Sequence, residues 1–289
     1  MTDLSKELGI PLGKPIELVA LAVKESAIRC RTLGSHIPIT LRKVRGGVEG
    51  EILSVRPEKL WQFKNTNYMS GKVESVRIDI PALNLEPLSL NDPRPWKPEE
   101  EYWGEPDDPT LKYFKGIKKF GQRTSYEMEQ ILPFEDPEDP FDDPITVAND
   151  LFQEGQFDEA YRMMEKLLVE DLRCLDAHAH LGNWLFNRAK GPQSFSLEMS
   201  RKHFEVGVRI GELSFPGDEN IVLPWGRIDN RPYLRCLHGY GLALWRMGEA
   251  EEAHRQFERM LWFNPSDNQG ARFLLMDMDE GKTWDEVEW

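Results

Sequence analysis

Cysteine is scarce in this chain of 289 residues. The three cysteines, Cys30, Cys174 and Cys236, lie far apart and include no CxxC pair. A disulfide framework is built from an even number of cysteines, and a cysteine zinc site needs ligands at short spacing. We therefore expect three partly buried apolar thiols.

Long hydrophobic runs are also missing. No basic and then apolar leader follows Met1, and no run of 18 or more apolar residues occurs. Secretory signals show the first feature, and membrane-spanning helices show the second. The sequence therefore predicts a soluble, cytoplasmic protein without a membrane partner.

The motifs of the common enzyme classes are absent as well. The sequence contains no GxSxG nucleophile turn, no GxxxxGK[ST] phosphate loop and no GxGxxG dinucleotide turn. The six histidines lack the HExxH and zinc-finger spacings, and His178 and His180 would face different sides of a helix. No acidic run supplies the ligand set of a calcium loop. We predict a protein that is not an enzyme and that uses no cofactor or metal. A hydrolase built from the acidic runs, a further hypothesis, would need two carboxylates that converge in a pocket.

The net charge of −14 is unevenly distributed along the chain. Residues 1–80 hold 13 Lys and Arg against 9 Asp and Glu, whereas the remaining residues hold 23 against 41. An acidic surface repels nucleic acids and anionic lipids and attracts basic proteins. The two parts are therefore expected to face different partners.

The first 80 residues have the pattern of short strands separated by tight turns. In AIRCRTL, Ile28 and Cys30 alternate with Arg29 and Arg31, which gives a strand one buried and one wet face. Glycine, serine and asparagine separate the candidate strands. The six expected strands cover residues 16–23, 27–33, 37–43, 48–55, 59–64 and 72–80. We predict a small antiparallel barrel or sandwich over residues 1–80.

Basic and aromatic residues occur close together in this predicted β domain. They are Arg29, Arg31, Arg42, Lys43, Arg45, Lys64, Trp61, Phe63 and Tyr68. The combination is typical of surfaces that bind single-stranded nucleic acid. In the other interpretation, the charges form a solvated face and the aromatic residues form the core, which the small excess of positive charge favours. An RNA- or ribosome-associated factor is therefore the alternative function.

Proline is concentrated between residues 81 and 140, which hold 10 of the 20 prolines and the acidic runs EEEYWGEPDD and EDPEDPFDD. Proline cannot donate to a strand ladder, so this stretch is expected to be extended or disordered. Its aromatic residues, among them Trp96, Trp103 and Phe114, are too apolar for a free linker. We expect a strap on the protein surface, with a short helix or hairpin at KYFKGIKKF.

Small and large residues are spaced for two interlocking helices between Gly239 and Pro265. Gly241 and Ala253 would let two antiparallel backbones approach closely beside an apolar stripe that includes Phe257. Gly248 would end the first helix, and Pro265 would end the second.

This pattern resembles the tetratricopeptide repeat, a helix-turn-helix unit of about 34 residues. The upstream residues Ala148, Leu151, Gly155, Ala160, Met164 and Leu167 match Gly241, Leu244, Gly248, Ala253, Phe257 and Met260. A degenerate middle unit is expected around Gly182 and Phe204, interrupted near Gly191. A helix in NQGARFLLMDMDEG would cover the last unit, and Thr283–Glu286 has the pattern of a capping box. We predict an α+β protein with a β domain at 1–80, a proline-rich acidic strap at 81–140 and a helical-repeat solenoid at 141–289.

The resemblance implies a concave groove, lined by the first helix of each unit, that holds an extended peptide or a partner helix. The groove positions that the family register implies are Asn149, Gln153, Asp176, His180, Asn183, Asn187, Arg235, His238, Trp245 and Arg246. Asn149 and Asn183 take the position that grips the peptide backbone in chaperone-binding members, but Ile145 and Ala179 replace the lysine of those members. Recognition of an acidic carboxyl terminus is therefore not implied. In the other interpretation, these residues form a solvated helix face.

A long loop, Gly211–Arg231, separates the second and third predicted units. Long ordered loops in a compact array are commonly functional. Pro232 suits the first turn of the next helix, with Asp229 or Asn230 as its cap.

A basic and aromatic patch is expected in and after this loop, with the composition of an interface hot spot. Its members are Trp225, Arg227, Arg231, Tyr233 and Arg235. In the other interpretation, the rings fill a gap in the array and the arginines pair with acids. The sequence as a whole predicts an adaptor that binds a protein or peptide.

Overall fold

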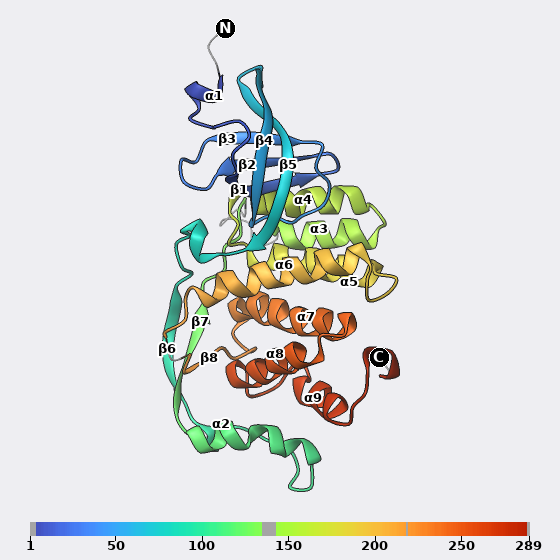
Figure 1. Ribbon diagram of the computed structural model, residues 1–289. Coiled ribbons are helices and arrows are strands. Elements are labelled where there is room, and N and C mark those ends of the chain that lie inside the picture. The colour runs from blue at the N-terminus through green and yellow to red at the C-terminus, as the bar shows by residue number, and fades with distance from the viewer. Residues whose placement is uncertain (1–3, 135–142, 218, 288–289) are drawn as a thin grey trace. The chain divides into compact units, whose positions relative to one another are not determined.

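The computed structural model describes residues 4–134, 143–217 and 219–287 (Figure 1). The chain forms two compact units, of which the first comprises residues 1–86 and 132–177 and the second comprises residues 87–131 and 178–289. The fold is mixed α and β, with a closed barrel in the N-terminal part and helices in the C-terminal half. No helix in the described ranges is long and apolar enough to cross a membrane. The acidic run at 135–142 lies outside the described residues.

Five strands close into a barrel in the first unit, after a short helix α1 (Leu4–Glu7). The strands are β1 (Ile16–Lys24), β2 (Ala27–Thr32), β3 (Pro38–Arg42), β4 (Glu51–Phe63) and β5 (Thr66–Ile78). Their order is β1-β2-β3-β5-β4, and β4 pairs back to β1. The pairs are antiparallel except for β3 with β5, which are parallel. The prediction of a small barrel is confirmed; it differs in this parallel contact and in having five strands where six were expected.

The strands predicted at 48–55 and 59–64 are a single strand, β4. Pro57 lies between the two predicted segments, and proline cannot donate to a ladder. In β4, Pro57 is buried and lies where the register with β5 is irregular, and such a bulge accommodates the missing donor. The long strands β4 and β5 continue beyond the barrel as a two-stranded arm (Figure 1).

The barrel core consists of aliphatic side chains together with Cys30 and Met69. Ile28 and Cys30 are buried, in agreement with the predicted alternation, and Leu18 and Leu41 are completely buried as well. All three cysteines of the chain are buried, as expected, and burial raises the pKa of the Cys30 thiol to about 12.

Helices α3 (Pro144–Gln153) and α4 (Phe157–Glu170) pair in the first unit. The turn between them contains Gly155 at a φ of 82°, a conformation that glycine adopts without steric cost. Ala148 and Ala160 are fully buried, as the predicted interlock requires.

Five helices follow α4 in the described ranges: α5 (Leu175–Arg188), α6 (Phe195–Glu212), α7 (Arg231–Met247), α8 (Ala250–Phe263) and α9 (Ala271–Asp279). Within the second unit, α6, α7, α8 and α9 pack in succession (Figure 1). Gly248 ends α7 in the left-handed conformation, and Thr283 and Glu286 form the predicted capping box. The predicted helix boundaries in this part are therefore confirmed closely.

Glycines in the second unit form notches that aromatic rings fill. A Cβ atom on Gly241 would lie 2.6 Å from the ring of Phe257. A Cβ atom on Gly182 or Gly239 would lie 2.7 or 2.3 Å from the ring of Phe204. The predicted contact of small with large residues between paired helices is confirmed for Gly241 and Phe257.

The proline-rich stretch is more ordered than the sequence indicated. Strands β6 (Leu90–Trp96) and β7 (Arg123–Met128) form an antiparallel pair, and β7 pairs in parallel with β8 (Ile221–Val222). The expectation that proline would keep this stretch out of regular ladders is wrong here, because β6 is an edge strand and its prolines fall at or beside a register shift. The expected short helix is present as α2 (Lys115–Phe120).

Part of the long loop after α6 is hydrogen-bonded to this sheet. Asn230, predicted as a helix cap, makes no side-chain cap bond to α7. Its buried amide instead accepts a hydrogen bond from the Met128 N–H at 2.7 Å and donates to the Tyr126 carbonyl at 2.9 Å. Asn230 therefore fixes the loop to β7, while Pro232 occupies the first turn of α7 as predicted.

Candidate binding surfaces

The groove positions implied on α5 are divided between exposed and buried side chains. Asn183 and Asn187 are exposed and lie about one turn apart. His180 is half-buried, with its ring 6.2 Å from that of Trp184. Asp176, at the start of the helix, is buried. The α5 surface therefore offers two amides to a ligand.

The implied positions on α3 belong to the first unit. Asn149 is half-buried, and Gln153 is exposed at the end of the helix. Ile145 is buried at the start of α3. The α3 surface therefore offers one exposed amide, that of Gln153.

Arg246 of α7 is engaged within the fold. Its Nη1 donates to the Phe186 carbonyl at 2.8 Å, and its Nη2 donates to the Ala189 carbonyl at 2.7 Å. The last carbonyls of a helix have no partner inside it, so these bonds cap the end of α5. The guanidinium also lies 5.6 Å from the ring centre of Trp284.

Trp245 and His238 of α7 are also packed into the second unit. Trp245 is 2 % exposed and meets the ring of Trp284 edge-on. The His238 ring lies 6.2 Å from that of Phe257. Burial lowers the pKa of His238 to about 4, so its imidazole is neutral at neutral pH. The helical periodicity of the sequence assigned Trp245 and His238 to one helix, but it could not show which neighbouring residues bury their rings.

Three members of the predicted basic and aromatic patch come together. The guanidinium of Arg231 lies 5.2 Å from the ring centre of Trp225, and that of Arg235 lies 6.0 Å from it. Tyr233 is fully buried. Arg227 Nη1 donates a hydrogen bond to the Asp92 carbonyl at 2.7 Å. The patch is therefore reduced to Trp225, Arg231 and Arg235.

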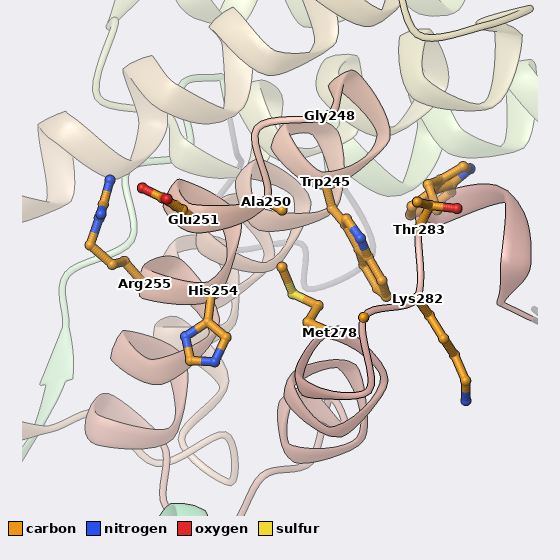
Figure 2. Close-up of a pocket in the computed structure, with 11 residues that line it drawn as sticks. Trp245, Gly248, Ala250, Glu251, His254, Arg255, Met278, Lys282 and Thr283 are labelled. Carbon is orange, nitrogen blue, oxygen red and sulfur yellow. The ribbon is translucent and has the colours of Figure 1, made fainter.

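A cleft not predicted from the sequence lies between the α7–α8 turn and the segment after α9; we call it the α7–α8 cleft. Its volume is about 600 Å³. Figure 2 shows Trp245, Ala250 and Met278 at its centre. The same view places His254 and Arg255 on one side and Lys282 and Thr283 on the other. The centre is apolar, and the rim carries charges of both signs because Glu251 also lines it.

Hydrogen bonds and ion pairs hold one wall of this cleft. His254 Nε2 lies 3.3 Å from Asp279 Oδ1. Asp279 Oδ2 accepts hydrogen bonds from Lys112 Nζ at 2.8 Å and from the Tyr113 hydroxyl at 2.7 Å. These donors lower the pKa of Asp279 to about 2. The carboxylate therefore joins α8, α9 and the segment before α2.

The capping box was the sequence signal nearest to this cleft. The Thr283 N–H donates to Glu286 Oε2 at 2.8 Å, which turns the chain back and brings Trp284 to the cleft. Ala250, Met278 and Lys282 carried no signal of their own, because small, apolar and basic residues are common on any helix end.

Groups suited to metal binding are not found in the described ranges, where no three His, Cys, Asp or Glu residues gather in a suitable cluster. His178 and His203 do lie together, with ring centres 5.7 Å apart, and both are buried. Burial, and then the neighbouring His178, lower the pKa of His203 well below its usual value. The His203 ring is therefore neutral at neutral pH.

The candidate site is therefore an apolar cleft with a charged rim in the second unit. A scan against models of known protein families and a search of curated proteins find no match to this chain.

Proposed function

We propose that this chain is a protein-binding adaptor that holds a segment of a partner protein in the α7–α8 cleft. The observation that carries the proposal is the cleft itself, with Trp245, Ala250 and Met278 at its centre. A volume of about 600 Å³ falls in the usual range for ligand sites and accommodates a few peptide side chains.

The chemistry of the cleft suits a peptide better than a small charged metabolite. Its centre takes an apolar side chain, and Glu251, Arg255 and Lys282 on the rim offer both charges to flanking residues. An apolar centre within a polar rim is the usual anatomy of a protein interface. The ligand expected here is a short extended segment with one apolar anchor between charged residues.

The helix pairs support a relationship to tetratricopeptide repeats as part of this proposal. The α7–α8 pair joins Gly241 to Phe257 at its crossing, and Gly155 and Gly248 occupy equivalent turns of the α3–α4 and α7–α8 pairs. The exposed asparagines Asn183 and Asn187 on α5 form a second set of contacts in such an array.

The test begins with peptides selected from a displayed random library on the full chain. Their affinities are then measured by fluorescence anisotropy for the wild type and for Ala250→Trp. Ala250 is exposed at the first residue of α8, so the larger side chain fills the cleft without entering the core. We expect at least about a tenfold loss of affinity.

Matched variants distinguish this cleft from the groove implied by the repeat resemblance. Asn183→Ala and Asn187→Ala change exposed α5 residues outside the cleft and are expected to leave affinity within about twofold. Arg255→Glu reverses one rim charge and is expected to change which flanking charges are selected. Selected peptides that bind Ala250→Trp as well as the wild type would contradict the proposal, as would a library that yields no binder.

A further inference from the structure

We infer that the outer face of the barrel at β4 and β5 binds single-stranded nucleic acid, a function beyond the proposed peptide cleft. The face is defined by a row of paired residues across four strands. Arg29 on β2 pairs with Thr40 on β3, Thr40 pairs with Tyr68 on β5, and Tyr68 pairs with Trp61 on β4.

This row points away from the barrel core. The neighbours Cys30, Leu41, Met69 and Leu60 pack in or against the core. Side chains alternate between the two faces of a strand, so Arg29, Thr40, Tyr68 and Trp61 share the outer face. The earlier interpretation of these aromatic residues as core is therefore wrong.

Two aromatic rings on this face form a platform. The rings of Trp61 and Tyr68 are stacked, with centres 5.6 Å apart and planes 12° apart, and both side chains are half-buried. Lys59 Nζ lies 5.6 Å from the centre of the Trp61 ring. A partly exposed pair of rings beside a cation is the arrangement that stacks bases and meets phosphates.

The arm formed by β4 and β5 continues the same chemistry to its tip. Phe63 is 60 % exposed, and Lys64 Nζ lies 5.6 Å from the centre of its ring. Lys64 and Asn65 make the turn with φ angles of 45° and 61°. A third ring and a further cation therefore extend the platform formed by Trp61 and Tyr68.

Cations on the barrel surface differ in whether they form ion pairs. Arg56 forms an ion pair with Glu74 at 2.7 Å, and Arg77 forms ion pairs with Glu17 and Asp79. Arg29, Arg42, Lys59 and Lys64 are exposed and form no ion pair with any residue that the structure describes. Of these, Lys59 and Lys64 lie directly beside the rings of Trp61 and Phe63.

The ion pairs explain how residues 1–80, with only a small excess of positive charge, can bind a polyanion. Glu17 and Glu74 pair with Arg77 and Arg56, so Lys59 and Lys64 beside the rings keep no ion pair with any residue in the described ranges. Phosphates need local cations, and bases need flat apolar rings, and this face supplies both. An acidic peptide would use the cations but would leave the rings exposed.

The test measures binding of a labelled oligouridylate of about 12 nucleotides to the full chain at low salt. Trp61→Ala and Tyr68→Ala are each expected to lower affinity by about tenfold, because each removes a stacking ring. Trp61→Phe keeps a ring and is expected to retain most of the affinity. Circular dichroism and thermal unfolding confirm that each variant is folded.

The salt dependence supplies an independent readout. Lys59→Ala is expected to reduce the slope of log affinity against log salt by about 0.7, the value for one phosphate contact with a single strand. Arg56→Ala, on the same strand but paired with Glu74, is the matched control and should leave the slope unchanged.

Three outcomes would overturn the inference. The first is no binding of the oligonucleotide at low salt, which would leave this face to a protein partner. The second is equal affinity of the wild type and the two alanine variants, which would mean that the rings do not stack on bases. The third is equally tight, equally Trp61-dependent binding of a heparin polyanion, which carries no bases.

Discussion

The barrel and the second unit use their aromatic residues in opposite ways. In the barrel, the core is aliphatic, and Trp61, Phe63 and Tyr68 lie on the outer face or the arm. In the second unit, Phe204 and Phe257 are buried and fill glycine notches. A partly exposed aromatic ring outside the core is available to contact a ligand, whereas a buried ring that fills a glycine notch stabilises the fold. The comparison explains why aromatic composition alone could not locate a site.

Cations differ between the two regions in the same way. In the second unit, Arg246 caps α5, and the buried Arg123 lies between the rings of Trp96 and Trp262 at 4.7 and 4.1 Å. Burial lowers the pKa of Arg123 to about 10. In the barrel, Lys59 and Lys64 remain exposed beside single rings. Cation and ring pairs therefore serve packing in one region and present a surface in the other.

The largest effect is expected for Phe204→Ala. Its ring is 2 % exposed and fills the notches of both Gly182 and Gly239, so its loss leaves a cavity that the helices cannot close without moving. We expect the free energy of unfolding to fall by about 3–5 kcal/mol. Chemical denaturation of the full chain measures it. A loss below about 1 kcal/mol would show that the notches are not packed as described.

A pH-dependent effect of somewhat smaller size is expected for Glu49→Gln in the first unit. Burial raises the pKa of Glu49 from 4.5 to about 7, with smaller contributions from Glu165 and Glu51, while the Val23 N–H that bonds to it acts in the opposite direction. A carboxyl group with a raised folded pKa favours folding below its unfolded pKa, and this stability is lost as pH rises through the folded pKa.

The wild type should therefore lose stability relative to Glu49→Gln between about pH 4.5 and about pH 7, with a difference of up to about 3 kcal/mol above that window. Denaturation at about pH 5 and about pH 8 measures the difference. Glu25→Gln, at an exposed position, is the control and should show no such change. A difference that is constant with pH would rule out titration of Glu49 as its cause.

Gly241→Ala tests the crossing of α7 and α8. The added Cβ would lie 2.6 Å from the Phe257 ring, which must move, and we expect a loss of about 1–3 kcal/mol by overpacking. The α3–α4 pair has Ala148 and Met164 at the corresponding positions, which indicates the compensation. The double variant Gly241→Ala with Phe257→Met should recover part of the loss, and additive losses would argue against direct contact.

Local features of the fold could be predicted from the sequence because their causes are local. Gly248, Pro232 and the Thr283–Glu286 capping box act through the backbone of their own helix, so their positions were predicted correctly. The alternation of Ile28 and Cys30 with Arg29 likewise shows the inner face of β2.

Contacts between distant segments could not be predicted in this way. Strand β8 pairs Ile221 with Thr124 of β7, and nothing in either short stretch identifies the other. The prolines of β6 suggested a stretch without ladders, but an edge strand needs donors on one side only. The helical pattern assigned Arg246 to a helix but not its partners, the carbonyls of Phe186 in α5 and of Ala189 directly after it.

The smallest effect is expected for Phe63→Ala, which repeats the substitution of Phe204→Ala in the other region. Phe63 is 60 % exposed at the tip of the arm and pairs with Thr66 across the turn. Its removal creates no cavity, so the free energy of unfolding should change by less than about 0.5 kcal/mol. Denaturation under the same conditions as for Phe204→Ala gives the direct comparison. A large loss would mean that the ring packs against another part of the protein and would remove Phe63 from the aromatic platform. If stability is unchanged but oligouridylate binding weakens, Phe63 contributes to ligand binding and not to the stability of the fold. Phe204, in the second unit, is expected to do the opposite.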